Sequence, residues 1–189
     1  MTEASWKPTP EAENFYRRWL AHLHDQFTHH QAPEQRDEIV RDELHQIYLG
    51  RPQAGKAAAA LTTELASRIL VEALDPANVS FSGFEPDPNV DADRYAARRP
   101  LIWFWLMFDR SPLGLNDWLG SRFRCMLAQH IFAHIGKGVR IGADVRFRYG
   151  YNLTIPDNCT IGRGVFLDDS QPLSLSPGSR IDDGQRYPR

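Results

Sequence analysis

Apolar residues recur every six positions toward the C-terminal end of this 189-residue chain, and this spacing restricts the fold more than any other feature of the sequence. The spaced positions form series separated by shifts of phase: Ile135, Ile141 and Phe147; Ile155, Ile161, Leu167 and Leu173; Leu175 and Ile181. A period of six fits neither an α-helix, with about 3.6 residues per turn, nor a plain alternating strand. It is typical of a solenoid, in which short strands joined by turns each place one side chain inward. We therefore expect a solenoid from residue 135 onward.

The first 134 residues carry their apolar side chains at helical spacing instead. Thr9 is a typical N-cap residue and Pro10 a typical first residue of a helix. The apolar stripe of that helix is expected to comprise Phe15, Trp19, Leu23 and Phe27. Further helices are expected at residues 33–50, 57–74 and 116–136, and a long loop at residues 75–99. Apolar side chains of the third helix that should face inward are Leu61, Leu65, Ile69 and Leu74.

Composition narrows the class of protein. The formal net charge of −2 gives no reason to expect a nucleic-acid-binding protein, and the two cysteines, Cys125 and Cys159, cannot form a disulfide scaffold. The N-terminus lacks the basic and apolar segments of a signal peptide, so a cytoplasmic protein is expected. The apolar run at residues 101–108 is too short to span a membrane. It is either a buried core segment or, because arginines flank it, an interfacial membrane patch.

Residues 135–146 resemble the hexapeptide repeat of the left-handed β-helix acyltransferases. The Tyr-Gly-Tyr-Asn segment at residues 149–152 is similar to the Tyr-Gly-x-Asn segment of the maltose and galactoside O-acetyltransferase branch. The Val-Phe-Leu-Asp-Asp segment at residues 165–169 resembles the following coil of that branch. The resemblance implies an α+β fold, in which a helical region at residues 1–134 precedes a short left-handed parallel β-helix at residues 135–189.

The resemblance also implies a function. Such enzymes transfer the acetyl group of acetyl-CoA, their cosubstrate, to a hydroxyl group of a carbohydrate-like acceptor, at a site between subunits of a homotrimer. Carried over by position, Asp169 is the coil-end aspartate that contacts the acceptor, and Arg148, Tyr149 and Asn152 are the other acceptor-binding residues.

The same resemblance implies a catalytic histidine, acting as general base, well beyond Asp169. Residues 170–189 contain no histidine, and the last one in the chain, His134, precedes the first predicted coil. We therefore assign no catalytic residue and expect a C-terminally truncated acyltransferase that is inactive in this form. The alternative is a short solenoid whose coils serve only to assemble with other chains.

Other motifs are less specific. Residues 50–56 match the spacing of a phosphate-binding loop up to Lys56, but Ala57 replaces the magnesium-binding Ser or Thr, which favours a linker between helices. Histidines that could bind metal or be solvated are His22, His24, His29 and His30. His130 and His134 could likewise bind metal, line a cleft or pack against the solenoid. Neither group forms a complete ligand set, so no metal is assigned.

Overall fold

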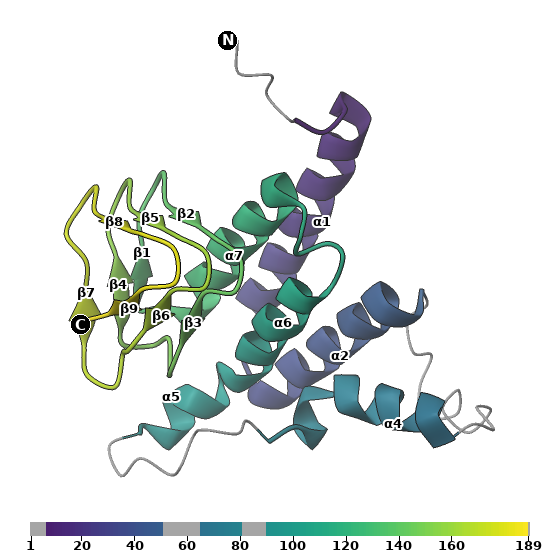
Figure 1. Ribbon diagram of the computed structural model, residues 1–189. Helices are drawn as coiled ribbons and strands as arrows, with labels where there is room; N and C mark the ends of the chain where they lie inside the picture. The colour runs from purple at the N-terminus through teal and green to yellow at the C-terminus, as the bar shows by residue number, and fades with distance from the viewer. Residues whose placement is uncertain (1–6, 51–64, 81–89, 189) are drawn as a thin grey trace.

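The computed structural model describes residues 7–50, 65–80 and 90–188. Helices occupy the N-terminal part and short parallel strands the C-terminal part, as expected (Figure 1). The helical elements are α1 (Pro10–His29), α2 (Pro33–Leu49), α4 (Leu65–Leu74), the 3₁₀ turn η1 (Pro76–Asn78), α5 (Ala92–Ala96), α6 (Arg99–Arg110) and α7 (Asp117–Ile131).

Capping residues set the helix ends that the sequence predicted best. The Thr9 hydroxyl accepts a hydrogen bond of 3.3 Å from the Ala12 N–H at the start of α1. Gly50 ends α2 in a left-handed conformation, with φ of 70°. The predicted end of the helix at residues 116–136 is wrong, because α7 ends at Ile131 and Phe132 already has an extended backbone.

Several side chains and segments differ from expectation. Phe15 and Ile69 are 58% and 59% exposed, so the stripes of their helices are narrower than predicted. The loop expected at residues 75–99 contains η1, α5 and the first residue of α6. Residues 101–108 form most of α6 and bury Leu101, Phe104, Trp105 and Phe108, which supports the core interpretation of this segment.

The strands form three parallel sheets of three strands each. They are β1 (His134–Ile135), β2 (Arg140–Ile141), β3 (Arg146–Phe147), β4 (Leu153–Ile155), β5 (Thr160–Ile161), β6 (Phe166–Leu167), β7 (Leu173–Ser174), β8 (Arg180–Ile181) and β9 (Arg186–Tyr187). The sheets join β1 to β4 to β7, β2 to β5 to β8, and β3 to β6 to β9. This regular stepping confirms the predicted β-solenoid.

Each strand residue of the first two coils pairs with a strand residue 20 positions later, as His134 does with Thr154 and Arg146 with Phe166. The coil is therefore two residues longer than three six-residue repeats, and the extra residues explain the shifts of phase in the sequence. They lie at the corner between the third strand of one coil and the first strand of the next. Leu173 is consequently not an inward position. It pairs with Leu153 and is half-buried, whereas Leu175 is buried.

The helices close the first coil of the solenoid. In Figure 1, α7 lies between the coils and the other long helices. The Trp105 indole N–H donates to the Val145 carbonyl at 2.9 Å, and its ring meets Phe147 edge to face at 5.3 Å. Phe132 meets the same Phe147 ring at 5.1 Å. The helical and solenoid parts therefore share one hydrophobic core.

A buried ion pair fixes this junction. Arg124 of α7 and Asp109 of α6 lie 2.6 Å apart, and each side chain is only 3% exposed. Arg124 also donates to the carbonyls of Gly114, at 3.1 Å, and Ile141, at 3.4 Å. The second oxygen of Asp109 accepts the N–H of Asp144 at 2.9 Å. One ion pair thus binds two helices to the turn between β2 and β3.

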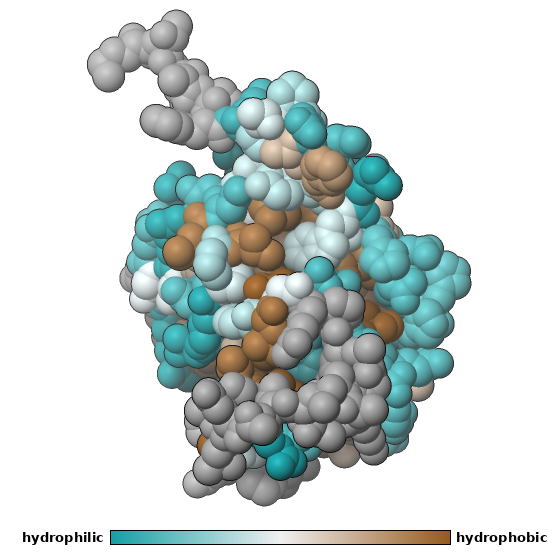
Figure 2. Space-filling model, turned by 90° about the vertical axis from the view of Figure 1, so that its right-hand side faces the viewer, coloured by the Kyte–Doolittle hydropathy of each residue, from teal (hydrophilic) through white to brown (hydrophobic). Residues whose placement is uncertain are grey.

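The surface of the helical side includes hydrophobic areas between hydrophilic ones (Figure 2). Among the described residues, large apolar side chains that are exposed are Phe15, Ile69, Leu70 and Leu115. In the same part of the chain, no helix combines the length and the hydropathy that crossing a bilayer demands.

Replacing Arg124 by Met should lower the free energy of unfolding by about 3–5 kcal/mol, because Asp109 would stay buried without its partner. Equilibrium urea unfolding measures this loss. Arg163→Met is the matched control, since Arg163 also bridges the solenoid to α7 through Asp117, at 2.7 Å, but with side chains 61% and 85% exposed. That control should lose less than about 1 kcal/mol. Equal losses in the two variants would contradict the account.

Candidate functional site

The residues predicted to bind an acceptor meet at the corner between β3 and β4. Arg148, Tyr149 and Asn152 belong to this corner, and Asp169 lies beneath it at the end of β6, one coil later. The structure therefore brings all four predicted residues together. Their predicted contact with an acceptor remains a prediction.

Asp169 is fully buried, with 0% exposure. Its carboxylate accepts the N–H groups of Arg148, at 2.7 Å, Tyr149, at 3.0 Å, and Gly150, at 2.7 Å. Its carbonyl accepts the side-chain amide of Asn152 at 3.0 Å. Burial raises the pKa of Asp169, and the three N–H bonds offset this only in part. Within a single chain, Asp169 and Asn152 hold the corner in shape.

Gly150 is needed at the tip of this corner. Its φ of +75° is a conformation that residues with a Cβ rarely adopt. A Cβ there would also collide with the side chain of Ile131, at the end of α7. Glycine thus allows the corner to lie directly against the helical part.

The tyrosines of the corner are packed rather than solvated. Tyr149 and Tyr151 are each 3% exposed and stack with ring centroids 5.4 Å apart. The Tyr151 hydroxyl accepts the Asp91 N–H at 3.0 Å. Arg94 of α5 donates to the Tyr151 carbonyl at 2.9 Å, and its guanidinium lies 4.5 Å from the Tyr151 ring. The Tyr149 ring meets the Tyr95 ring of α5 edge to face, with centroids 6.2 Å apart, so this predicted acceptor residue also belongs to the contact between α5 and the solenoid.

Asp168, the neighbour of Asp169, faces outward. Arg148 donates to it at 2.8 Å and Arg186 of β9 makes a second, shorter ion pair with it. Burial alone would raise the pKa of Asp168, but hydrogen bonds from Arg186, Ser170 and Arg148 outweigh that effect and lower it. Asp168 is therefore an ionised acceptor of hydrogen bonds held between two guanidinium groups.

A hollow of about 400 Å³ opens beside Asp168. Its polar lining comes from Asp168, Ser170, Gln171 and Arg186, and its apolar lining from Pro172, Leu173 and Pro188. Asp168 is not among the acceptor-binding residues predicted from the sequence, where the pair Asp168 and Asp169 is more typical of solvated turn aspartates. Strand alternation was the available signal, since Val165, Leu167 and Asp169 are buried and the residues between them are not.

The remaining candidates divide into two groups. His130 lies next to His24 across the boundary of α7 and α1, whereas His134 is the exposed first residue of β1. Gly50 is the cap of α2, and the rest of the phosphate-binding-loop candidate lies outside the described residues. Over the described ranges, no group of three or more His, Cys, Asp or Glu side chains is placed to bind a metal ion.

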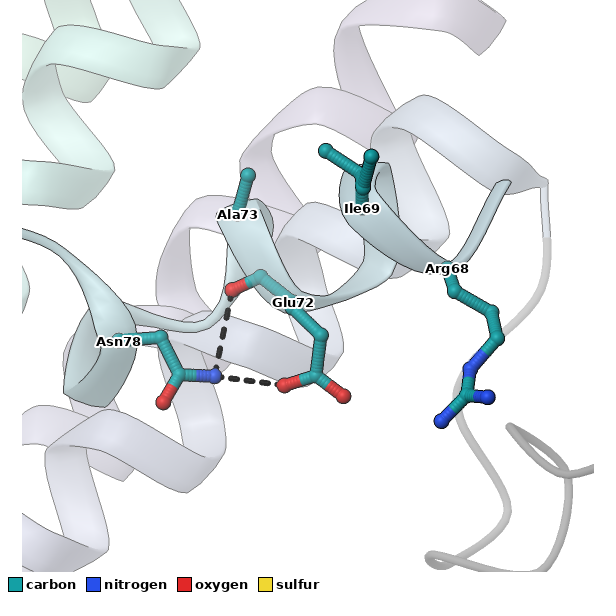
Figure 3. Close-up of a pocket in the computed structure, with 5 residues that line it drawn as sticks. All are labelled: Arg68, Ile69, Glu72, Ala73 and Asn78. Atoms are coloured by element: carbon teal, nitrogen blue, oxygen red, sulfur yellow. Dashed lines mark hydrogen bonds between the residues drawn. The ribbon is translucent and has the colours of Figure 1, made fainter. Parts of the chain in front are cut away.

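A second hollow, of about 560 Å³, lies along α4 and η1 (Figure 3). Ile69 and Ala73 extend from one side of α4, and Glu72 and Arg68 from the other. The side-chain amide of Asn78 donates to the Glu72 carboxylate at 2.7 Å. The same amide also donates to the Glu72 backbone carbonyl at 3.4 Å.

Comparison with known proteins identifies no relative of this chain, since no family model, curated protein or solved structure matches it.

Substituting Asn for Asp169 should cost about 2–3 kcal/mol of unfolding free energy, because an amide group would face buried N–H donors. Asp157→Asn is a suitable control, since the Asp157 carboxylate accepts one N–H, from Lys137 at 2.7 Å, in an exposed turn. It should cost less than about 1 kcal/mol. Urea titration of both variants tests the structural role of Asp169, which a negligible loss in Asp169→Asn would refute.

Proposed function

We propose that this chain carries the acceptor-binding part of a CoA-dependent O-acyltransferase of the hexapeptide-repeat class, which acylates a hydroxyl group of a carbohydrate-like molecule. The observation that carries the proposal is the hollow beside Asp168, which opens next to the Tyr-Gly-Tyr-Asn corner. The parallel solenoid and the convergence of Arg148, Tyr149, Asn152 and Asp169 at that corner support it.

The lining of the hollow suits a sugar-like acceptor. The Asp168 carboxylate can accept a hydrogen bond from a hydroxyl group, and Gln171, Ser170 and Arg186 can donate or accept others. Pro172, Leu173 and Pro188 provide an apolar wall for the C–H face of the ring. Few polar groups set in an apolar wall are typical of sites that orient a small ligand.

The reaction needs a base as well as a binding site. The acceptor oxygen attacks the thioester carbonyl of acetyl-CoA, the C–S bond breaks, and the CoA thiolate leaves while a base takes the hydroxyl proton. Asp168 is a weak base, because its pKa is lowered and two arginines bind it. Among its described lining residues the hollow has no histidine. We therefore expect this chain to bind the acceptor without turning it over.

Acceptor binding tests the proposal directly. A panel of mono- and disaccharides is titrated into the chain and followed by saturation-transfer NMR or calorimetry. At least one sugar should bind. Asp168→Asn should raise the dissociation constant of that sugar by about tenfold or more, because a charged hydrogen-bond acceptor is lost. Release of CoA thiol from acetyl-CoA, measured in parallel, should not exceed the rate without protein.

Asp182→Asn is the control for this experiment. Asp182 also forms a surface ion pair with an arginine, Arg180, at 3.1 Å, but it does not line the hollow. The Asp182→Asn variant should bind the sugar with the same affinity as the unaltered chain. The proposal is wrong if no sugar binds, or if Asp168→Asn binds as well as Asp182→Asn.

A second candidate function, assembly through the coils, has its own supporting observation. Within the described residues, β7, β8 and β9 pair with a neighbouring strand on one side only. A hollow of about 400 Å³ lies there, lined by Leu175, Ser176, Ser179, Arg180, Ile181, Gln185 and Tyr187. Unpaired strand edges and apolar side chains offer a surface on which another chain can add strands.

Assembly predicts an oligomer in light scattering, such as the trimer that the family resemblance implies. Ser176→Glu places a charge at this hollow and should shift the population toward monomer. Ser80→Glu, at an exposed position after η1 in the helical part, should leave the population unchanged. A monomeric unaltered chain at high concentration argues against this candidate.

A further inference from the structure

Two histidines far apart in the sequence meet where α1 packs on α7. Nδ1 of His24 and Nε2 of His130 share a hydrogen bond of 3.0 Å, and their ring centroids are separated by 4.9 Å. A metal ion between them would replace this hydrogen bond. His24 is exposed and His130 is half-buried, so the pair is open to solvent from one side. The contact depends on the tertiary fold, because 106 residues separate the two positions.

The geometry is close to that of a bidentate metal site. Zn²⁺ binds imidazole nitrogen at about 2.0–2.1 Å, and two such nitrogens in a tetrahedral site are about 3.3 Å apart. The two nitrogens would therefore separate by only a few tenths of an ångström, which rotation of the exposed His24 ring allows. The Phe27 ring contacts His130 edge to face at 5.8 Å and restricts its orientation.

The charge state at neutral pH favours binding. Burial, followed by the proximity of His24 and Arg36, lowers the pKa of His130 to about 4. His130 is therefore neutral at pH 7. A neutral imidazole keeps one lone pair, and the other ring nitrogen can carry the proton, so His130 can offer Nε2 to a metal ion.

We propose that His24 Nδ1 and His130 Nε2 bind a divalent metal ion of the borderline class, foremost Zn²⁺, with water completing its coordination. Imidazole ligands select Zn²⁺, Ni²⁺ and Cu²⁺, whereas Mg²⁺ and Ca²⁺ need oxygen ligands. No third His, Cys, Asp or Glu joins the pair within the described residues. With two protein ligands and the positive charge of Arg36 nearby, the affinity is moderate, in the micromolar range. The bound ion would link α1 to α7.

Calorimetric titration of Zn²⁺ into the full chain, without an affinity tag and in chelator-treated buffer, tests the site. One Zn²⁺ should bind per chain with a micromolar dissociation constant. His24→Ala and His130→Ala should each weaken that binding by about tenfold or more, because one of the two ligands is lost. Saturating Zn²⁺ should raise the melting temperature of the unaltered chain and leave that of His24→Ala unchanged.

Two controls separate this site from scattered surface histidines. His29→Ala removes an exposed histidine of the same helix, whose Nδ1 already lies 2.8 Å from the Asp25 carbonyl, and it should bind Zn²⁺ like the unaltered chain. The double variant at His24 and His130 should bind no more weakly than either single variant, because either change destroys a bidentate site. Because His24 is exposed, its alanine variant tests the proposal even if His130→Ala does not fold.

The proposal is overturned if Zn²⁺ does not bind below about 1 mM. It is equally overturned if His24→Ala binds Zn²⁺ as well as His29→Ala does, or if the losses in the single variants add in the double variant. Mg²⁺ in place of Zn²⁺ should give no heat of binding, and Mg²⁺ binding of equal strength would contradict the assigned metal class.

Discussion

The buried ion pair between Asp109 and Arg124 fixes where the solenoid lies relative to the helices. It joins α6 to α7 and, through the Ile141 carbonyl and the Asp144 N–H, fixes the first coil of the solenoid against them. The first coil in turn determines the register of the later coils, since every strand pairs with the one 20 residues away. The corner between β3 and β4, and Asp168 and Asp169 one coil later, are therefore placed from the helical core outward. A buried pair suits this task because its geometry is strict, even where its net contribution to stability is small.

Small or turn-forming residues follow many of the spaced apolar positions, and the six-residue spacing alone predicted the solenoid. The positions of Ile141, Phe147, Ile155, Ile161 and Leu167 as buried residues follow from it. The spacing also predicted that Leu173 points inward, which is wrong, because two extra residues at the corner move the inward position to Leu175. Phe15 and Ile69 lie at helical spacing yet are exposed, since helix periodicity specifies a face but not how wide a surface the neighbouring helices cover. The helix α6 was not predicted, because its nearly continuous apolar run has no clear period.

The candidate site shows the same limit at the scale of one residue. The family resemblance predicts that Asp169 contacts the acceptor. In the structure, the Asp169 carboxylate instead accepts hydrogen bonds from three backbone N–H groups of the corner. Asp168 instead faces the adjoining hollow between Arg148 and Arg186. One inward carboxylate thus shapes the corner, while its outward neighbour lines the adjoining hollow. The contact between His24 and His130 lay beyond sequence reasoning for a different reason, because it depends on how α1 packs against α7.

The most direct test of the acceptor-binding hypothesis is a map of the amide resonances that change when the best-binding sugar is titrated into ¹⁵N-labelled chain. A chain of 21.6 kDa is well suited to this measurement. The account predicts that the largest changes fall on Asp168, Ser170, Gln171 and Arg186, around the hollow. Changes confined to α4 and η1, or to other parts of the chain away from this hollow, would contradict the acceptor-binding hypothesis.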